Sequence, residues 1–248
     1  MLWLAALVLA LVSLQISLYC TTLYLHRTLT HRALALHPAL AFFMRIQIWL
    51  TTGIIPKEWV AVHRKHHRYP DQEGDPHSPQ LKGLLKILTG NLYYYNREAR
   101  NRETVARFAP DIRQDWLDRH VFCHGYAGLL LGLLFFVVLL GPLAGGLAFV
   151  LQAAGYAVAS AVINGIGHAV GHQPFDNTAT NFQLVAWLVA GEGLHNNHHA
   201  YPTSARFSLQ PGEYDPAWPM IRALTFLRLA RPLHIAPPAS SSPPAHAG

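Results

Sequence analysis

The stretch Gly191-Glu192-Gly193-Leu194-His195-Asn196-Asn197-His198-His199 spaces three histidines so that a helix would bring them together. Residues i, i+3 and i+4 are neighbours on an α-helix, so these three imidazoles would share one face. The same spacing recurs in the run His63-Arg64-Lys65-His66-His67. Neutral imidazole binds iron, zinc, copper or nickel. One triad alone is also compatible with a solvated helix face, but two matching triads in one chain predict a metal site.

Composition favours a membrane protein with a single domain. Of the 248 residues 51% are hydrophobic and only 13% are charged, whereas soluble domains usually carry about a quarter charged residues. No long polar linker divides the chain, so residues 1–234 are expected to form one domain. Residues 235–248, rich in Pro, Ser and Ala, are expected to be a disordered tail. Cys20 and Cys123 are too few for a disulfide framework or a cysteine metal site, and we expect both to be reduced packing residues.

Three apolar segments decide the expected fold. Residues 1–25 contain no charge and predict one uncleaved transmembrane helix. Residues 124–163 carry no Lys, Arg, Asp or Glu, and Gly141-Pro142 divides them into a hairpin that crosses out and back. Residues 33–62 contain Arg45, and an arginine at the centre of a span is unfavourable. His31 and His63 must reach one site, so the segment between them would have to cross the membrane an even number of times. Two crossings need about 40 residues, more than this segment has. The segment therefore predicts an interfacial or re-entrant helix. The fold class is therefore an all-α polytopic membrane protein with about three transmembrane helices, interfacial helices and a cytoplasmic helical cap.

The distribution of positive charge predicts the orientation of this fold. Fifteen of the nineteen Lys and Arg residues fall between Arg27 and Arg119. By the positive-inside rule this segment is cytoplasmic, with the histidine clusters on that side and the amino terminus outside. We expect an integral protein of a bacterial cytoplasmic membrane. No basic motif with interleaved aromatic residues is present, so nucleic acid is not an expected partner.

Other candidate ligands have weaker local patterns. His26 and His31 would lie about 140° apart on an ideal α-helix, so this pair converges only where the helix ends or bends. His168 and His172 compete for one position after the apolar hairpin. Asp75 follows the first triad in a turn-rich acidic loop. It is compatible with orienting a ligand imidazole and equally with a solvated loop.

Taken together and in order, these motifs resemble the membrane fatty acid desaturases, most closely the stearoyl-CoA desaturase type. The resemblance covers roughly residues 20–230. It is carried by His26-x4-His31, His63-x2-His66-His67, Asn164-x3-His168 and Gly191-Glu-Gly-x-His195-x2-His198-His199. Further matches are Glu58-Trp59, Asp75-Pro76-His77 and Pro174-Phe175-Asp176.

The resemblance implies a di-iron centre in which Asn164 reaches one iron through a water. It favours His168 over His172, places Trp59 on the acyl-chain tunnel, and puts Asp75 and Glu192 behind the ligands. The implied reaction joins an acyl chain, O2, two electrons and two protons, and yields a cis double bond and two waters. The nine implied protein ligands are His26, His31, His63, His66, His67, His168, His195, His198 and His199.

Departures from the family leave partners and alternatives open. Ala61 stands where family members carry an arginine that grips CoA, so the fatty acyl substrate is linked to CoA, acyl carrier protein or phospholipid. The chain has no heme segment or cysteine-based electron-transfer site, so a separate donor of the ferredoxin, rubredoxin or cytochrome b5 type is expected. A di-iron hydroxylase or acetylenase would use the same ligands. A non-catalytic membrane metal-binding protein would need polar groups inside its spans, and residues 1–25 and 124–163 carry no charge.

Overall fold

The computed structural model describes residues 1–238, which are helical apart from loops and two short strands. Strand β1 (Leu34–Leu36) pairs antiparallel with β2 (Ala230–Pro232), so the predicted all-α fold carries one small sheet that the sequence did not reveal. Strands of three residues are too short for a detectable alternation of apolar side chains. The helices are α1 (Leu2–Cys20), η1 (Thr21–Thr30), α2 (Pro38–Thr52), α3 (Pro56–Arg68), α4 (Pro79–Lys82), α5 (Leu84–Ala99), α6 (Arg102–Phe108), η2 (Asp118–Phe122), α7 (Gly125–Leu140), α8 (Pro142–Ile166), α9 (Gln183–Leu188), α10 (His195–Ala200) and α11 (Ala217–Phe226).

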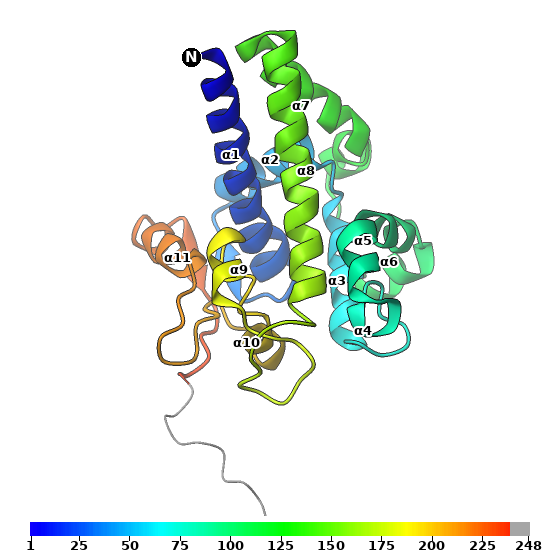
Figure 1. Ribbon diagram of the computed structural model, residues 1–248, viewed down its shortest axis with the longest axis vertical. Coiled ribbons are helices and arrows are strands. Elements are labelled where there is room, and N and C mark those ends of the chain that lie inside the picture. The colour runs from blue at the N-terminus through cyan, green and yellow to red at the C-terminus, as the bar shows by residue number, and fades with distance from the viewer. Residues whose placement is uncertain (239–248) are drawn as a thin grey trace, which may run out of the picture.

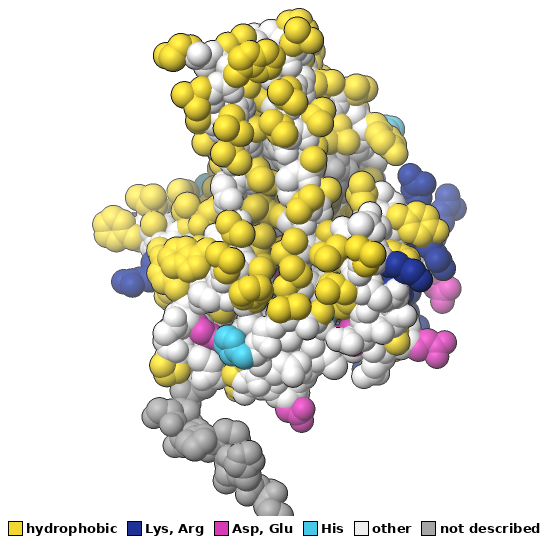
Figure 2. Space-filling view, viewed as in Figure 1, with side chains coloured by type: hydrophobic (Ala, Val, Ile, Leu, Met, Phe, Trp, Pro, Cys, Tyr) yellow, Lys and Arg dark blue, Asp and Glu magenta, His cyan; other side chains and the backbone are white. Residues whose placement is uncertain are grey.

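One half of the molecule is an apolar helical bundle. Helices α1, α7 and α8 run side by side into this half, and the amino terminus lies at the same end as the α7–α8 turn (Figure 1). Hydrophobic side chains cover it, whereas the charged side chains gather over the other half (Figure 2). The continuous helix Leu2–Thr30 and α8 are each long and apolar enough to cross a membrane, and α7 is a shorter apolar helix. By length and composition, residues 1–238 thus contain two candidate membrane spans, or three if the bent pair α2–α3 counts as one span.

The predicted hairpin is present, and the segment expected to be interfacial or re-entrant is bent. Helices α7 and α8 follow one another directly and turn at Gly141, whose φ of +79° suits glycine. Helices α2 and α3 meet at a bend of 85°, so residues 33–62 do not form one straight span. Gly53 ends α2 in the left-handed region and Pro56 begins α3, which is the usual pairing of glycine after a helix and proline at its start.

Arg45, the charge that argued against a span through α2, is paired. Its guanidinium donates to Asp115 at 2.8 Å and to Asp118 at 3.0 Å. These two carboxylates belong to the segment that leads into α7, so the ion pairs connect α2 to the charged half of the molecule.

Helix α7 packs on α2 through glycines. A Cβ atom added at Gly128 would lie 2.3 Å from the carbonyl oxygen of Trp49, and one added at Gly132 would lie 2.1 Å from that of Leu50. Both distances are far below van der Waals contact. Membrane helices approach closely through small residues because apolar side chains gain little by leaving lipid.

The folded part of the chain extends slightly beyond residue 234. The amide of Ala205 donates to the carbonyl of His234 at 2.9 Å. Ala236 is buried, and its amide donates to Ser204 Oγ at 3.0 Å. Most of the predicted tail, residues 239–248, lies outside the described residues. Cys20 and Cys123 are both free, as expected, with Cys20 buried and Cys123 partly exposed.

The α2–α7 contact predicts that a glycine-to-alanine substitution has different effects on stability at two positions. Gly132→Ala should lower the apparent unfolding temperature of the detergent-purified protein, because the added methyl group meets the backbone of α2. Gly146→Ala is the control, since nothing lies within 4 Å of a Cβ added there. Alanine is the better helix former by about 1 kcal/mol, so Gly146→Ala should leave the temperature unchanged or raise it. Equal unfolding temperatures for the two variants would contradict this packing.

Candidate metal centre

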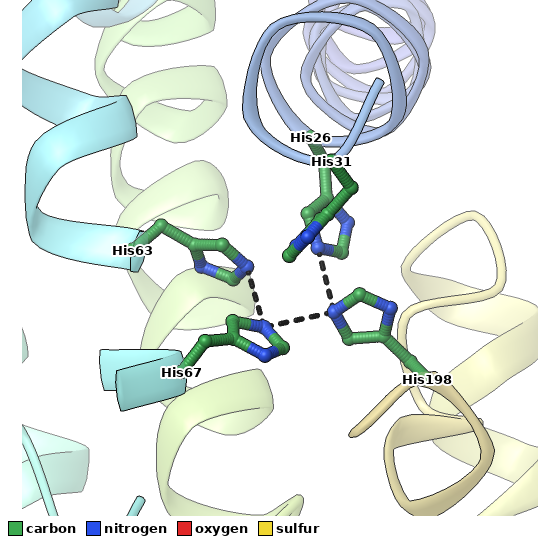
Figure 3. Close-up of side chains that lie close together, drawn as sticks. All are labelled: His26, His31, His63, His67 and His198. Atoms are coloured by element: carbon green, nitrogen blue, oxygen red, sulfur yellow. Dashed lines mark hydrogen bonds between the residues drawn. The ribbon is translucent and has the colours of Figure 1, made fainter. Parts of the chain in front are cut away.

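Five histidines from three separate helical segments meet at one point. Each offers a ring nitrogen, and these nitrogens all lie within 4.8 Å of one another. His26 and His31 come from the end of η1, His63 and His67 from α3, and His198 from α10 (Figure 3). The Nε2 atom of His198 lies 2.9 Å from that of His26 and 2.9 Å from that of His67. We call this set the five-histidine cluster.

The convergence of His26 and His31 depends on a π-helix. Segment η1 continues α1 with hydrogen bonds from residue i+5 to residue i, including that from the His31 amide to the His26 carbonyl at 3.1 Å. This bonding places residue i+5 over residue i, so the two imidazoles lie on one face with ring centroids 4.9 Å apart. The 140° separation expected from an α-helix is therefore wrong here. The helix also continues to Thr30 instead of ending near residue 25.

Four further histidines form a second cluster beside the first. They are His66, His168, His195 and His199, again with ring nitrogens within 4.8 Å of one another. The Nε2 atom of His66 lies 3.1 Å from that of His168 and 3.3 Å from that of His199. The clusters touch, because the rings of His67 and His199 stack with centroids 4.3 Å apart. We call this set the four-histidine cluster.

Each sequence triad is divided between the two clusters. His63 and His67, four residues apart, stay together, and His66 joins the other cluster. Likewise His195 and His199 stay together and His198 joins the other cluster. Adjacent helical residues point about 100° apart, so His66 and His67 can face neighbouring sites. The expectation that each triad acts as one face is therefore wrong, although all nine histidines come together.

Three carboxylates lie behind the histidines and fix their ring orientation. Glu192 is 2.7 Å from Nδ1 of His26, and Asp75 is 3.0 Å from Nδ1 of His66. Asp71, to which the sequence reading gave no role, is 2.7 Å from Nδ1 of His168. A carboxylate accepts the Nδ1 proton of a neutral imidazole, which leaves Nε2 as a lone pair.

This arrangement of ring nitrogens favours the binding of a cation. The Nε2 atoms of His66 and His168 face each other at 3.1 Å while Asp75 and Asp71 hold their Nδ1 protons. When both rings are neutral and held in this way, the lone pair of one Nε2 faces the lone pair of the other. A proton or a metal ion between the two nitrogens removes this repulsion. Burial lowers the pKa of His168, and lowers that of His195 and His199 well below the ordinary value. Neutral imidazoles are the form that binds metals, so the donor set is compatible with a metal site.

Arg27 is part of this site and does not lie at the water-exposed flank of a span. Its side chain is buried, its Nε donates to the Ala205 carbonyl at 3.0 Å, and its guanidinium pairs with Asp215 at 3.0 Å and with Glu192 at 3.4 Å. The guanidinium also lies 3.6 Å above the ring of Phe207. The basic segment therefore begins with a buried arginine, and its cation compensates the carboxylate that orients His26.

A cavity opens beside the clusters, with His26 and His63 on its wall. Trp59 also lines it and stacks on His63 with centroids 4.8 Å apart. Asn164 lines the same cavity and donates from Nδ2 to Asn91 Oδ1 at 2.9 Å. Leu18, Val62, Ile163 and Tyr156 supply much of the remaining wall.

Two other histidines require comment. The side chain of His172 is 64% exposed and belongs to neither cluster, so His168 occupies the position for which the two residues competed. His77 is buried next to the four-histidine cluster, and its ring stacks on His66 with centroids 4.7 Å apart. No role for His77 was predicted beyond its place in the Asp75-Pro76-His77 match to the family.

Comparison with known proteins identifies similar chains. The family described as "Fatty acid desaturase" matches residues 1–229. A sn-1 stearoyl-lipid 9-desaturase of Anabaena variabilis is 33% identical over 226 residues, which cover 87% of this chain and 78% of that protein. An acyl-CoA 5-desaturase of Anemone leveillei is 32% identical over 85% of this chain and 65% of its own length. A sn-1 stearoyl-lipid 9-desaturase of Synechocystis sp. is 30% identical over 87% of this chain and 67% of its own length.

The buried ion pairs predict that two neighbouring arginines differ in importance. Arg27→Met leaves Glu192 and Asp215 buried without a counter-charge, which costs about 3–5 kcal/mol and should lower both the unfolding temperature and metal retention. Arg32→Met is the control, because the Arg32 side chain is 69% exposed in its pair with Asp111, and exposed pairs contribute about 0–1 kcal/mol. Thermal unfolding and metal content of the purified variants check this. Equal effects of the two substitutions would contradict the role given to Arg27.

Proposed function

The chain belongs to the fatty acid desaturase family and is an oxidoreductase that desaturates fatty acyl chains, and we propose that it does so at a di-iron centre held by the two histidine clusters. The observation that carries this proposal is the convergence of nine imidazoles from distant parts of the sequence into two touching clusters. Each cluster would hold one iron, and Asn164 would contribute to one of them through a water.

The donor set supports iron working with O2. Nine imidazoles, with carboxylates hydrogen-bonded behind three of them, suit a divalent first-row metal. Neither cluster includes a thiolate that a strong oxidant would consume. When bound, two irons would supply the oxidising power from O2 that removes hydrogen from an unactivated methylene group.

The protein's own part is to hold and shield the acyl chain. The cavity beside the clusters has apolar walls, including Leu18, Val62 and Ile163, which would bind a hydrocarbon chain and exclude water. A second cavity, between α2, α5 and α8, shares Trp59, Tyr95, Tyr156 and Ser160 with it. We infer that the two together accommodate the chain, with Trp59 positioning it next to the five-histidine cluster.

The carrier end of the substrate would lie in a basic groove. This groove shares Ile55 and Glu58 with the second cavity and is also lined by Lys57, Arg100 and Arg102. These three cations form no ion pair within residues 1–238. They would attract a phosphate group, as found in CoA, acyl carrier protein or a phospholipid. The relatives include enzymes named for stearoyl-lipid and for acyl-CoA substrates.

Electrons would come from a separate protein of the ferredoxin, rubredoxin or cytochrome b5 type. An acidic donor would be attracted to the Lys- and Arg-rich segment between Arg27 and Arg119. This segment would face the cytoplasm of a bacterial cell, with the clusters on the same side of the membrane.

Expression in a host that lacks acyl desaturases tests the proposed reaction. The host lipids should gain a cis-monounsaturated fatty acid under aerobic conditions, and purified protein should form it from acyl substrate, O2 and reductant. His66→Ala and His198→Ala each remove one histidine from a different cluster, and both should abolish the product. His172→Ala is the matched control and should remain active. A hydroxylated product would instead assign the chain to the hydroxylases, and full activity of His66→Ala would contradict the metal role of the clusters.

The arrangement of the helices predicts a specific topology. Met1 and the α7–α8 turn lie at the same end of the apolar bundle (Figure 1), so reporter fusions at Met1 and Gly145 should report the outer side. A fusion at Asn101, between α5 and α6, should report the cytoplasm. If Met1 and Asn101 report the same side, the helix Leu2–Thr30 does not cross the membrane as proposed.

A further inference from the structure

A tenth histidine, His77, is buried at the edge of the metal centre, and its ring nitrogens have no hydrogen-bond partner in the described part of the chain. The residue is 4% exposed, and neither Nδ1 nor Nε2 makes a hydrogen bond within residues 1–238. Burying an imidazole without hydrogen bonds costs free energy, so such a group in a folded protein calls for an explanation. Its backbone amide, in contrast, donates to Asp75 at 3.0 Å. Asp75 therefore positions both His77 and the ring of His66.

His77 faces the four-histidine cluster. It stacks on His66, and together with His66 and Asp75 it forms a third group whose ligand atoms lie within 4.8 Å of one another. No ring of the five-histidine cluster stacks or packs edge-on against it among the described residues. The ring of His77 thus belongs with one of the two clusters and not with both.

His77 and Asn164 line the same cavity. Asn164 donates its amide hydrogen to Asn91, which leaves its Oδ1 free to accept a hydrogen bond. Some polar groups of this wall are paired, since Thr21 bonds Tyr156 at 2.8 Å and Ser160 accepts from Asn91 at 3.0 Å. A neutral imidazole offers one donor and one acceptor, so His77 and Asn164 can both bind one small polar molecule.

We propose that His77 is a positioning residue of the metal centre, which shares with Asn164 the hydrogen bonding of a water on the four-histidine side. The inference rests on the proposed di-iron function, in which Asn164 acts through a water. Without His77 this water would lose one of its hydrogen-bonding partners. His77 holds the water and does not itself bind metal, because the four-histidine cluster has its own histidines and the ring of His77 lies against His66.

Mössbauer spectroscopy of protein enriched in ⁵⁷Fe separates this role from a purely structural one. His77→Leu should keep both irons and change the quadrupole splitting of one of the two, with desaturation lowered about tenfold, the scale of outer-shell effects at metal sites. His77→Gln, which restores a donor and an acceptor, should recover the wild-type spectrum and most of the activity. His172→Leu is the exposed control and should match wild type. If His77→Leu does not accumulate, His77→Phe is measured in its place.

Three outcomes would overturn the proposal. Unchanged signals from both irons would show that His77 does not touch the environment of either metal. Loss of one iron from His77→Leu would make His77 a direct ligand. Failure of His77→Gln to restore the spectrum would show a packing role. Wild-type protein with two irons and desaturase activity would support the proposed function whatever happens at His77, whereas wild-type protein without iron would overturn both.

Discussion

The structure depends on burying many neutral imidazoles whose lone pairs face one another. His66 and His168 show the constraint most clearly, because Asp75 and Asp71 hold their Nδ1 protons and leave two Nε2 atoms 3.1 Å apart. Such an arrangement is unfavourable without a positive ion between the rings. The carboxylates that fix the ring orientations thus create the site, and the apolar half of the molecule needs only to place the four segments that carry the histidines side by side.

The junction of α1 and η1 shows how local backbone geometry serves this constraint. An α-helix would carry His26 and His31 to different faces, and the change to π-helical hydrogen bonding brings them together. The same segment buries Arg27, whose charge is offset by Asp215 and Glu192. Glu192 in turn holds His26. A buried cation therefore lies one residue from a candidate metal ligand, and both are stabilised by the same carboxylate.

Much of the architecture could be predicted from residue patterns. Uncharged stretches identified α1, α7 and α8, and Arg45 together with the length of residues 33–62 indicated that the intervening segment is not a simple span. The repeated histidine spacing identified six of the nine clustered histidines, and the family resemblance identified the others. The contact between the two triads joins segments that are far apart in the sequence. The spacing of histidines within one helix cannot predict such a contact.

Other features could not be predicted because they depend on tertiary contacts. The division of each triad between two clusters follows from where α3 and α10 meet. The π-helical bonding of η1, which brings His31 next to His26, does not show in the residue pattern. Asp71 and His77 lie in a loop whose composition reads as solvated, although the structure buries His77 and orients Asp71 toward His168. The burial of Arg27 could not be predicted, because its partners Glu192 and Asp215 are more than 160 residues away in the sequence. In each case the residue either contacts a partner more than 80 residues away in the sequence, or is buried by parts of the fold that its own segment does not predict.

The most direct test of this account is the metal content of the protein purified from its membrane without added metal. Two clusters built from neutral imidazoles predict about two irons per chain, measured by elemental analysis against protein concentration determined by amino-acid analysis. One zinc per chain with no iron would contradict the di-iron centre, even if the fold and the convergence of the histidines were correct.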